Sequence, residues 1–145
     1  MRGEANMSWV DETDVVVLGS GGAGLAAAIV AHDEGARVVV LEKGQLIGGT
    51  TATSGGILWV PNNPHMAELG IEDSEADALA YLESLSLGVM DMTLARTFIR
   101  EAPNMIRHLE SNTALGFHVA AGYPDYHPEN PGGKPQGGRS LDPDL

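Results

Sequence analysis

Residues 14–25 of the chain read DVVVLGSGGAGL, in which a short apolar run is followed directly by a cluster of glycines. The three valines and Leu18 are typical of a buried strand, because β-branched and large apolar side chains pack well in a sheet. The alanine-rich segment 25–31 favours a helix. Strand, glycine turn and helix therefore follow one another in the order of a βα unit that binds the phosphates of a nucleotide.

The glycines of this stretch fall at the three positions of the pattern G-x-G-x-x-G. Gly19 permits a tight turn, Gly21 lets a pyrophosphate approach the backbone, and Gly24 lets the helix pack close to the strand. The unpaired N–H groups at the start of the helix would then point at the phosphates. The pattern predicts a strand over 13–18 and a helix over 22–34.

The segment after the predicted helix fits the same unit. The apolar run 38–41 predicts a second buried strand over 37–42, and Glu42 at its end lies eighteen residues after Gly24. A carboxylate at this place can accept hydrogen bonds from both hydroxyls of an adenosine ribose. Two parallel strands joined by one helix imply a right-handed crossover. The other interpretation is an ordinary βαβ unit whose glycines only make a turn.

A second glycine-rich segment occupies residues 44–56, where an NAD-binding domain would continue into another crossover helix. Its sequence GQLIGGTTATSGG holds five glycines, three threonines and a serine. This composition resists a long helix. The crowded backbone N–H groups and short hydroxyls suit wrapping around a polar ligand, and the alternative is a flexible linker.

Composition limits the classes of function. The net charge of −12, from 20 acidic and 8 basic residues, argues against nucleic acid and anionic membrane surfaces as partners. The absence of cysteine excludes disulfides and thiolate chemistry. The longest apolar run, residues 25–31, is far shorter than the ~20 residues of a membrane span. Residues 1–12 carry no apolar core, so we expect an N-terminal extension, no transmembrane segment and a cytoplasmic location.

The rest of the chain predicts smaller elements around this core. They are a strand at 57–60, a helix at 74–87, helical pieces at 92–100 and 103–110, and a strand at 116–119. Pro103 is placed in the first turn of the second helical piece, where its missing N–H does no harm. Nine of the seventeen residues from 122 to 138 are Gly or Pro, which predicts an irregular loop. Tyr123, Tyr126 and His127 lie in this loop, where a tyrosine can simply pack and a histidine is usually solvated.

Three segments, 19–24, 42–43 and 48–56, resemble the FAD-binding start of the fumarate reductase/succinate dehydrogenase flavoprotein superfamily. Within it the chain is most similar to the 3-ketosteroid dehydrogenase branch, through residues 55–63, 124–126 and 138–140. The resemblance implies an α/β fold, a Rossmann-like FAD-binding domain with a parallel βαβ core and added helices. Superfamily members are several times longer and carry a separate substrate-capping domain. We therefore expect residues 13–145 to be the N-terminal part of an incomplete FAD-binding domain.

The resemblance also implies which residues hold FAD. The first turn would hold the pyrophosphate, Glu42 the adenosine ribose, and the loop 49–56 the pyrophosphate, ribityl chain and flavin. Respiratory members attach FAD covalently through a histidine in this loop, and residues 44–56 contain none, so noncovalent FAD is expected. The implied cofactor-binding residues are Gly19, Ser20, Gly21, Gly22, Ala23, Gly24, Glu42, Lys43, Gly49, Thr50, Thr51, Ser54, Gly55 and Gly56.

The implied activity is FAD-dependent oxidation of a C–C bond next to the carbonyl of a steroid or another enone or ketone, with an unidentified electron acceptor. Tyr126 stands at the place of an active-site tyrosine in the branch, within Pro-Asp-Tyr. The main base and the carbonyl donors would lie beyond residue 145, so the 145 residues alone are expected to be inactive. No metal is expected. The alternatives are a fumarate-reductase-like enoate reductase, which would clamp a dicarboxylate with arginines, and a non-catalytic NAD- or FAD-binding module.

Overall fold

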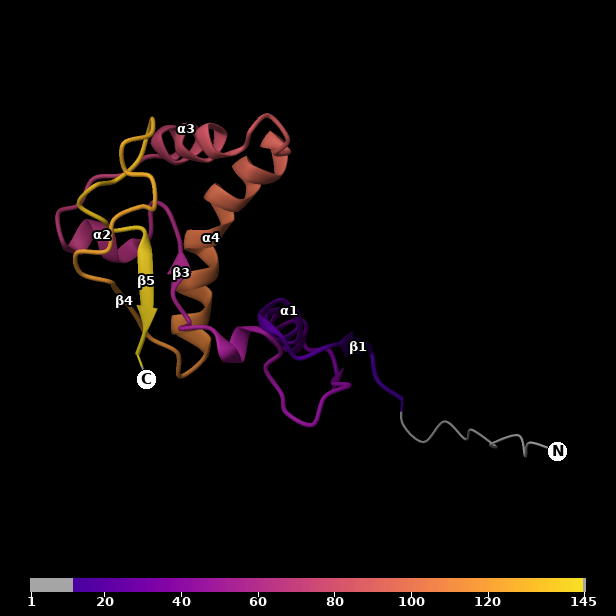
Figure 1. Ribbon diagram of the computed structural model, residues 1–145. Coiled ribbons are helices and arrows are strands. Elements are labelled where there is room, and N and C mark those ends of the chain that lie inside the picture. Colours follow the sequence, from indigo (N-terminus) through magenta and orange to yellow (C-terminus); the bar gives the residue numbers. More distant parts are fainter. Residues whose placement is uncertain (1–11, 145) are drawn as a thin grey trace. The chain divides into compact units, whose positions relative to one another are not determined.

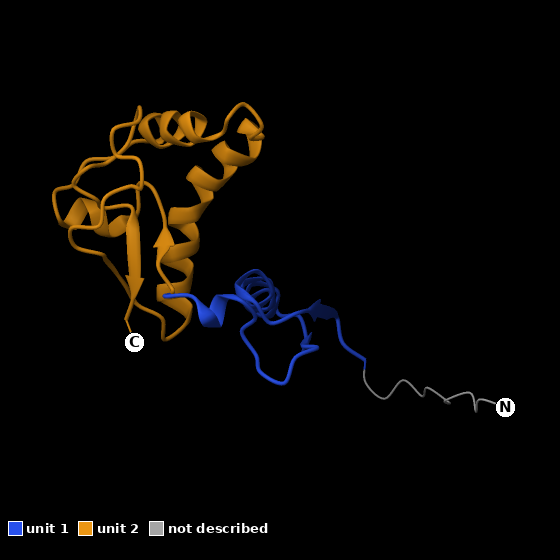
Figure 2. Cartoon of the chain, viewed as in Figure 1, with its two compact units in different colours: residues 1–55 blue, residues 56–145 orange. Residues whose placement is uncertain are grey.

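The computed structural model describes residues 12–144 and divides the chain into two compact units, residues 1–55 and 56–145 (Figure 2). Each unit has a sheet of its own. The predicted N-terminal extension lies outside the described residues, apart from its last residue, Glu12.

The first unit is a parallel βαβ unit made of β1 (Val15–Leu18), α1 (Gly22–Asp33) and β2 (Val38–Leu41). The two strands pair in register, with Val15 opposite Val38 and Leu18 opposite Leu41. Parallel neighbours cannot be joined by a tight turn, and α1 supplies the crossover (Figure 1). The predicted fold class, an α/β fold with a parallel βαβ core, is confirmed.

The sheet of the first unit has one covered and one bare face. Successive side chains of a strand point to opposite faces, and the odd positions of β1 and the even positions of β2 are half-buried. A Cβ added at Gly24 of α1 would lie 3.3 Å from Cγ1 of Val17, so this half-buried face lies against the helix. The opposite face carries Val16, Leu18, Val39 and Leu41, which are 52%, 79%, 39% and 53% exposed.

The second unit is built on a small antiparallel sheet. Its strands lie in the order β3 (Leu58–Trp59), β5 (Ser140–Pro143) and β4 (Phe117–Val119). Three helices accompany the sheet: α2 (Pro64–Glu68), α3 (Glu75–Leu85) and α4 (Met92–Asn112). Val60, Ala102, Ile106, Phe117 and Leu141 form the buried core between the sheet and α4.

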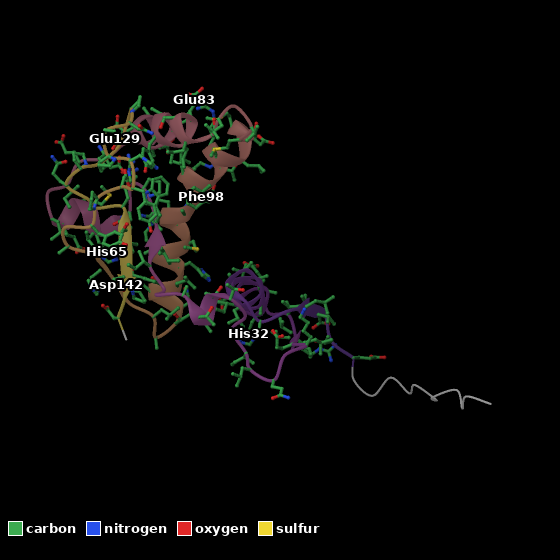
Figure 3. All side chains as sticks on the ribbon, viewed as in Figure 1. His32, His65, Glu83, Phe98, Glu129 and Asp142 are labelled. Atoms are coloured by element: carbon green, nitrogen blue, oxygen red, sulfur yellow. The ribbon has the colours of Figure 1, made fainter. Side chains whose placement is uncertain are left out.

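Contacts between the helices and the sheet tie the second unit together. His65 of α2 lies 2.8 Å from Oε1 of Glu110 in α4, and Phe98 of α4 stacks on Trp59 of β3 with 6.1 Å between ring centroids. Figure 3 shows His65 and Phe98 on their helices. None of the helices within residues 12–144 combines the length and the apolar character needed to cross a bilayer.

The prediction of two separate helical pieces around Pro103 is wrong, since α4 runs unbroken from Met92 to Asn112 with Pro103 inside it. A proline within a helix removes one N–H and crowds the carbonyl four residues earlier, here that of Ile99. One face of α4 is nevertheless buried, at Ala95, Ile99, Ala102, Pro103 and Ile106. Tertiary burial along this face outweighs the local cost of the proline.

A short helix and a strand of the second unit were not predicted. Asn63 caps the start of α2: its side chain accepts a hydrogen bond from the amide of Met66, and Pro64 is the first helical residue. Both are helix-start signals that the sequence already carries. β5 follows the irregular loop and pairs with β3 and β4, a long-range arrangement that has no local signal.

The bare apolar face of β1 and β2 makes the first unit the weak part of the isolated chain. Parallel strands are normally covered on both faces. For the 145-residue chain alone, we expect fast amide exchange in 15–18 and 38–41 and binding of an apolar dye, with slower exchange at Phe117 and Leu141. Hydrogen exchange read by mass spectrometry checks this. A matched variant, Val16→Thr with Val39→Thr, changes a register pair on the bare face and should lower dye binding. One sharp cooperative melt with uniform protection would contradict the prediction.

Candidate functional site

An open pocket of about 580 Å³ lies where β1 and β2 end in the first unit. Ligands of open α/β sheets bind at the carboxyl ends of the strands, and this pocket is at that edge. Six of the residues expected to bind the cofactor line it, together with the last residue of each strand: Gly19, Ser20, Gly21, Glu42, Lys43 and Gly49. The pocket therefore gathers residues from the turn, the end of β2 and the glycine-rich loop.

The glycines of the turn differ in what surrounds them. Gly19 has φ +94°, a conformation that glycine adopts without strain. A Cβ at Gly24 would overlap the carbonyl oxygen of Gly19, so a side chain there would push α1 away from the turn. A Cβ at Gly21 would meet nothing within 4 Å. The place of a side chain at Gly21 is thus empty, whereas at Gly24 that place is taken by the backbone of Gly19.

Some of the backbone N–H groups at the start of α1 already donate hydrogen bonds within the protein. The N–H of Gly22 donates to Oγ1 of Thr51 over 3.0 Å, and the N–H of Leu25 donates to the carbonyl of Gly21 over 2.9 Å. The N–H groups of Ala23 and Gly24 belong to the first helical turn, which has no carbonyl within the helix to bond. They carry the positive end of the helix dipole and suit an anion.

Glu42 is held ionised by hydrogen bonds. Its Oε2 accepts from the N–H of Ser20 over 3.0 Å and from the Ser20 hydroxyl over 2.6 Å, and its Oε1 accepts from the N–H of Gly44 over 2.7 Å. The Ser20 hydroxyl is the main cause that lowers the pKa of Glu42 to about 2, followed by the amide of Gly44. A carboxylate accepts about four hydrogen bonds, so Oε1 retains capacity for a ligand.

The glycine-rich loop folds back on the turn. The N–H of Gly48 donates to the Ser20 hydroxyl over 2.9 Å, and a Cβ at Gly49 would lie 3.2 Å from Cα of Gly21. The only regular structure of segment 44–56 is a 3-10 turn at Thr51–Thr53. The hydroxyl of Ser54 donates to the carbonyl of Thr51. Tertiary and local hydrogen bonds hold this segment, unlike a flexible linker.

Several of the expected cofactor-binding residues do not line the pocket of the first unit. Within the described part of the chain these are Gly22, Ala23, Gly24, Thr50, Thr51, Ser54 and Gly55. Gly56 is the first residue of the second unit, where a Cβ would lie 3.0 Å from Cγ of Pro143.

A buried ion cluster in the second unit was missed by sequence reasoning. Arg139 has no exposed surface, and its guanidinium donates two hydrogen bonds to Asp73 and one, over 2.9 Å, to Asp125. The guanidinium carbon also lies 5.5 Å from the ring centre of Trp59 and 5.7 Å from that of Tyr81. The indole N–H of Trp59 donates to Oδ1 of Asp125 over 2.7 Å. The signals in the sequence were the segments 124–126 and 138–140, which contain Asp125 and Arg139.

The cluster is arranged to keep Asp73 charged. Burial acts to raise the pKa of Asp73, but the hydrogen bonds and charge of Arg139 outweigh burial and lower it. The amides of Asn62 and Ser74 also donate to Asp73, each over 2.9 Å. Asp73 thereby joins Arg139 to the start of α3.

The same cluster holds the loop that carries Tyr126. On one side, Oδ2 of Asp125 accepts from the N–H of Lys134 over 2.9 Å. On the other, the N–H of His127 donates to the hydroxyl of Tyr81 over 3.2 Å. Asp125 and His127, the two neighbours of Tyr126, are thus held by hydrogen bonds to residues outside their own turn. The loop is fixed here although it has no regular secondary structure.

The side chain of Tyr126 itself is 83% exposed, and that of Tyr123 is 41% exposed. The hydrogen bond between the two hydroxyls raises the pKa of Tyr123. Within residues 12–144, no group of three His, Cys, Asp or Glu side chains is placed to hold a metal ion.

Comparison with known proteins points to one cofactor. Residues 14–141 match the model of a family described as "FAD binding domain". The chain is 41% identical over 134 residues to 3-oxosteroid 1-dehydrogenase of Mycobacterium tuberculosis, which covers 92% of this chain and 24% of the relative. It is 42% identical over 132 residues to 4-oxocyclohexanecarboxylate 2-dehydrogenase of Sinomonas cyclohexanicum, covering 91% and 23%.

A solved structure is also similar. It is 3-ketosteroid Δ1-dehydrogenase from Sterolibacterium denitrificans in complex with 1,4-androstadiene-3,17-dione. The TM-score is 0.85 and the identity 41%, over 92% of this chain and 23% of that one. The chain thus spans about a quarter of the length of the relatives that it matches.

Substitution at Gly21 tests the pocket. Gly21→Val should leave the protein folded, since its φ of −70° suits any residue and its surroundings are open. The branched side chain would fill the space for a pyrophosphate, so the full-length variant should purify without yellow colour. Ala27→Val, at an exposed position of α1, is the matched control and should retain flavin. Stoichiometric flavin in Gly21→Val would contradict the proposed position of the pyrophosphate.

Glu42→Ala tests the carboxylate. Loss of a charged acceptor should weaken FAD binding by about ten- to a hundredfold, measured by titrating the apoprotein and following flavin fluorescence. Glu42→Gln, which keeps an acceptor oxygen but loses the charge, should fall between parent and alanine variant. An unchanged dissociation constant for both variants would leave Glu42 without a role in binding.

Proposed function

The chain belongs to the FAD-binding domain family that its residues 14–141 match, and on this basis we propose that it is the N-terminal, cofactor-binding part of a longer flavoenzyme. The proposed reaction removes two hydrogens from a C–C bond beside a carbonyl, with a 3-ketosteroid or a related cyclic ketone as substrate. Relatives named for such reactions, at 41% and 42% identity, support the proposal.

The first unit fits FAD by its own geometry. The open space at Gly21 would admit the pyrophosphate, the N–H groups of Ala23 and Gly24 would donate to it, and the ionised Glu42 would accept from the ribose. FAD supplies the hydride-accepting chemistry when bound. The absence of histidine from residues 44–56 supports noncovalent binding.

The loop after Glu42 favours FAD over an NAD-binding module. An NAD-binding domain would continue into a second crossover helix, whereas an extended loop that returns to the nucleotide is expected of an FAD protein of this type. Segment 44–56 has only a three-residue 3-10 turn, and its Gly48 amide is bonded to Ser20 in the phosphate turn.

One observation favours a catalytic role for Tyr126: an almost fully exposed phenol stands on a backbone that is fixed on both sides. Asp125 is bonded to buried Arg139, and the N–H of His127 to buried Tyr81. Exposed loop residues are usually free to move, so a side chain carried by a fixed backbone is suited to meeting a ligand.

Tyr126 would take part in moving the proton next to the carbonyl. An unperturbed phenol loses its proton near pH ~10 and is a poor base at neutral pH. It serves more easily as a hydrogen-bond partner of a second catalytic tyrosine. The side chains of Tyr123 and Tyr126 are hydrogen-bonded to each other, a contact that raises the pKa of Tyr123 and would orient the phenol of Tyr126.

The enoate reductase alternative has no support in the arginines of the helices. A dicarboxylate clamp needs uncommitted guanidinium groups. Arg96 and Arg100 line a groove between α3 and α4 together with Glu75 and Glu83, and Nε of Arg100 is bonded to Glu101 over 2.7 Å. Two acidic side chains therefore line the groove with these arginines, Arg100 is already paired, and Arg107 donates to Oδ1 of Asn104 over 2.7 Å.

Removal of the phenol hydroxyl tests the proposal. Tyr126→Phe in the full-length enzyme should keep the FAD spectrum but lower kcat for 3-ketosteroid dehydrogenation by about a hundredfold or more. The assay uses a 3-ketosteroid with an artificial electron-accepting dye. Tyr123→Phe, which removes only the partner hydroxyl, should lower kcat much less. If both variants match the parent, Tyr126 is not catalytic.

A further inference from the structure

Ser20 is a buried polar residue beside an otherwise open pocket, with 1% of its surface exposed. Its hydroxyl donates to Oε2 of Glu42 over 2.6 Å and accepts from the N–H of Gly48 over 2.9 Å. A serine hydroxyl has one hydrogen to donate. Because that hydrogen goes to Glu42, the hydroxyl cannot donate to a phosphate at the same time.

We propose that Ser20 is a positioning residue, which acts on FAD through Glu42 by fixing the orientation of the carboxylate and joining it to the loop at Gly48. The inference rests on the proposed contact of Glu42 with the cofactor and does not depend on the steroid reaction. It gives Ser20 a role different from the direct cofactor contact expected from sequence.

The arrangement decides which carboxylate oxygen is available. Ser20 donates to Oε2 twice, through its hydroxyl and through its N–H over 3.0 Å, which occupies both lone pairs of that oxygen, whereas the N–H of Gly44 donates to Oε1. Oε1 is therefore the oxygen with capacity left for ribose hydroxyls. Without the Ser20 hydroxyl, the carboxylate could rotate and offer either oxygen.

The arrangement also fixes the charge of the pocket. The groups that bond Glu42 are Ser20, the amide of Gly44 and the backbone of Lys43, and the Lys43 side chain lines the same pocket. With Ser20 present, the pKa of Glu42 is about 2. Loss of the hydroxyl should raise that pKa towards its ordinary value of ~4.3. An acceptor that must be ionised is lost as the pH falls through its pKa, so the variant should lose FAD at higher pH than the parent.

A double-mutant cycle tests the inference in the full-length apoprotein, with FAD as the probe at pH 7.5. Ser20→Ala alone should raise the dissociation constant about tenfold. In the Glu42→Ala background, Ser20→Ala should change it less than about twofold, because coupled residues are not additive. Ser86→Ala, which removes a hydroxyl bonded to the carbonyl of Glu83 in the second unit, is the matched control.

Two further measurements separate positioning from a general loss of structure. The acid limb of FAD affinity should move upward in pH in Ser20→Ala, and the amide of Gly48 should exchange faster while amides of α1 do not. If Ser20→Ala does not fold, Ser20→Cys keeps the size of the side chain with a much weaker donor.

The outcomes are distinct. A tenfold loss of affinity in both backgrounds would overturn the inference, because Ser20 would then act without Glu42. An unchanged dissociation constant in Ser20→Ala, with a large effect of Glu42→Ala, would overturn the inference alone. No effect of Glu42→Ala would overturn both this inference and the proposed ribose contact.

Discussion

A guanidinium with no exposed surface has to find its counter-charges within the protein, because an unpaired buried cation costs several kcal/mol. Arg139 meets this requirement with Asp73, at the start of α3, and Asp125, in the loop 122–138. These residues are 66 and 14 positions away along the chain. One cation therefore holds together the start of β5, the start of α3 and the irregular loop. The position of Tyr126 depends on it, because Tyr126 follows Asp125 in that loop.

In the first unit a negatively charged side chain, Glu42, orders the neighbouring loops. The carboxylate of Glu42 collects donors from the turn after β1 and from the segment after β2, and Ser20 extends the network to Gly48. Each site thus consists of irregular backbone that one ionised side chain holds in place. Regular strands and helices supply the positions of these ions, and hydrogen bonds to them supply the order of the loops.

Local patterns were enough to predict the βαβ core, because β1, α1 and β2 follow from valine runs, an alanine-rich segment and glycines at fixed spacing. The continuity of α4 could not be predicted, since it depends on burial of the face around Pro103 by other segments. The Arg139 cluster joins residues too distant in sequence to leave a periodic signal. The position of the pocket residues at the ends of the strands could be predicted from the sequence. The hydrogen bond between Ser20 and Glu42 could not, because it depends on how the folded backbone brings the two residues together.

The bare face of β1 and β2 has a consequence for biosynthesis. Val16, Leu18, Val39 and Leu41 leave the ribosome before the whole of the second unit and remain exposed in the structure. At 5–20 residues per second, the residues from 42 to 145 take roughly 5–20 s to translate. Throughout that time these four side chains present an apolar surface that a holdase chaperone can bind.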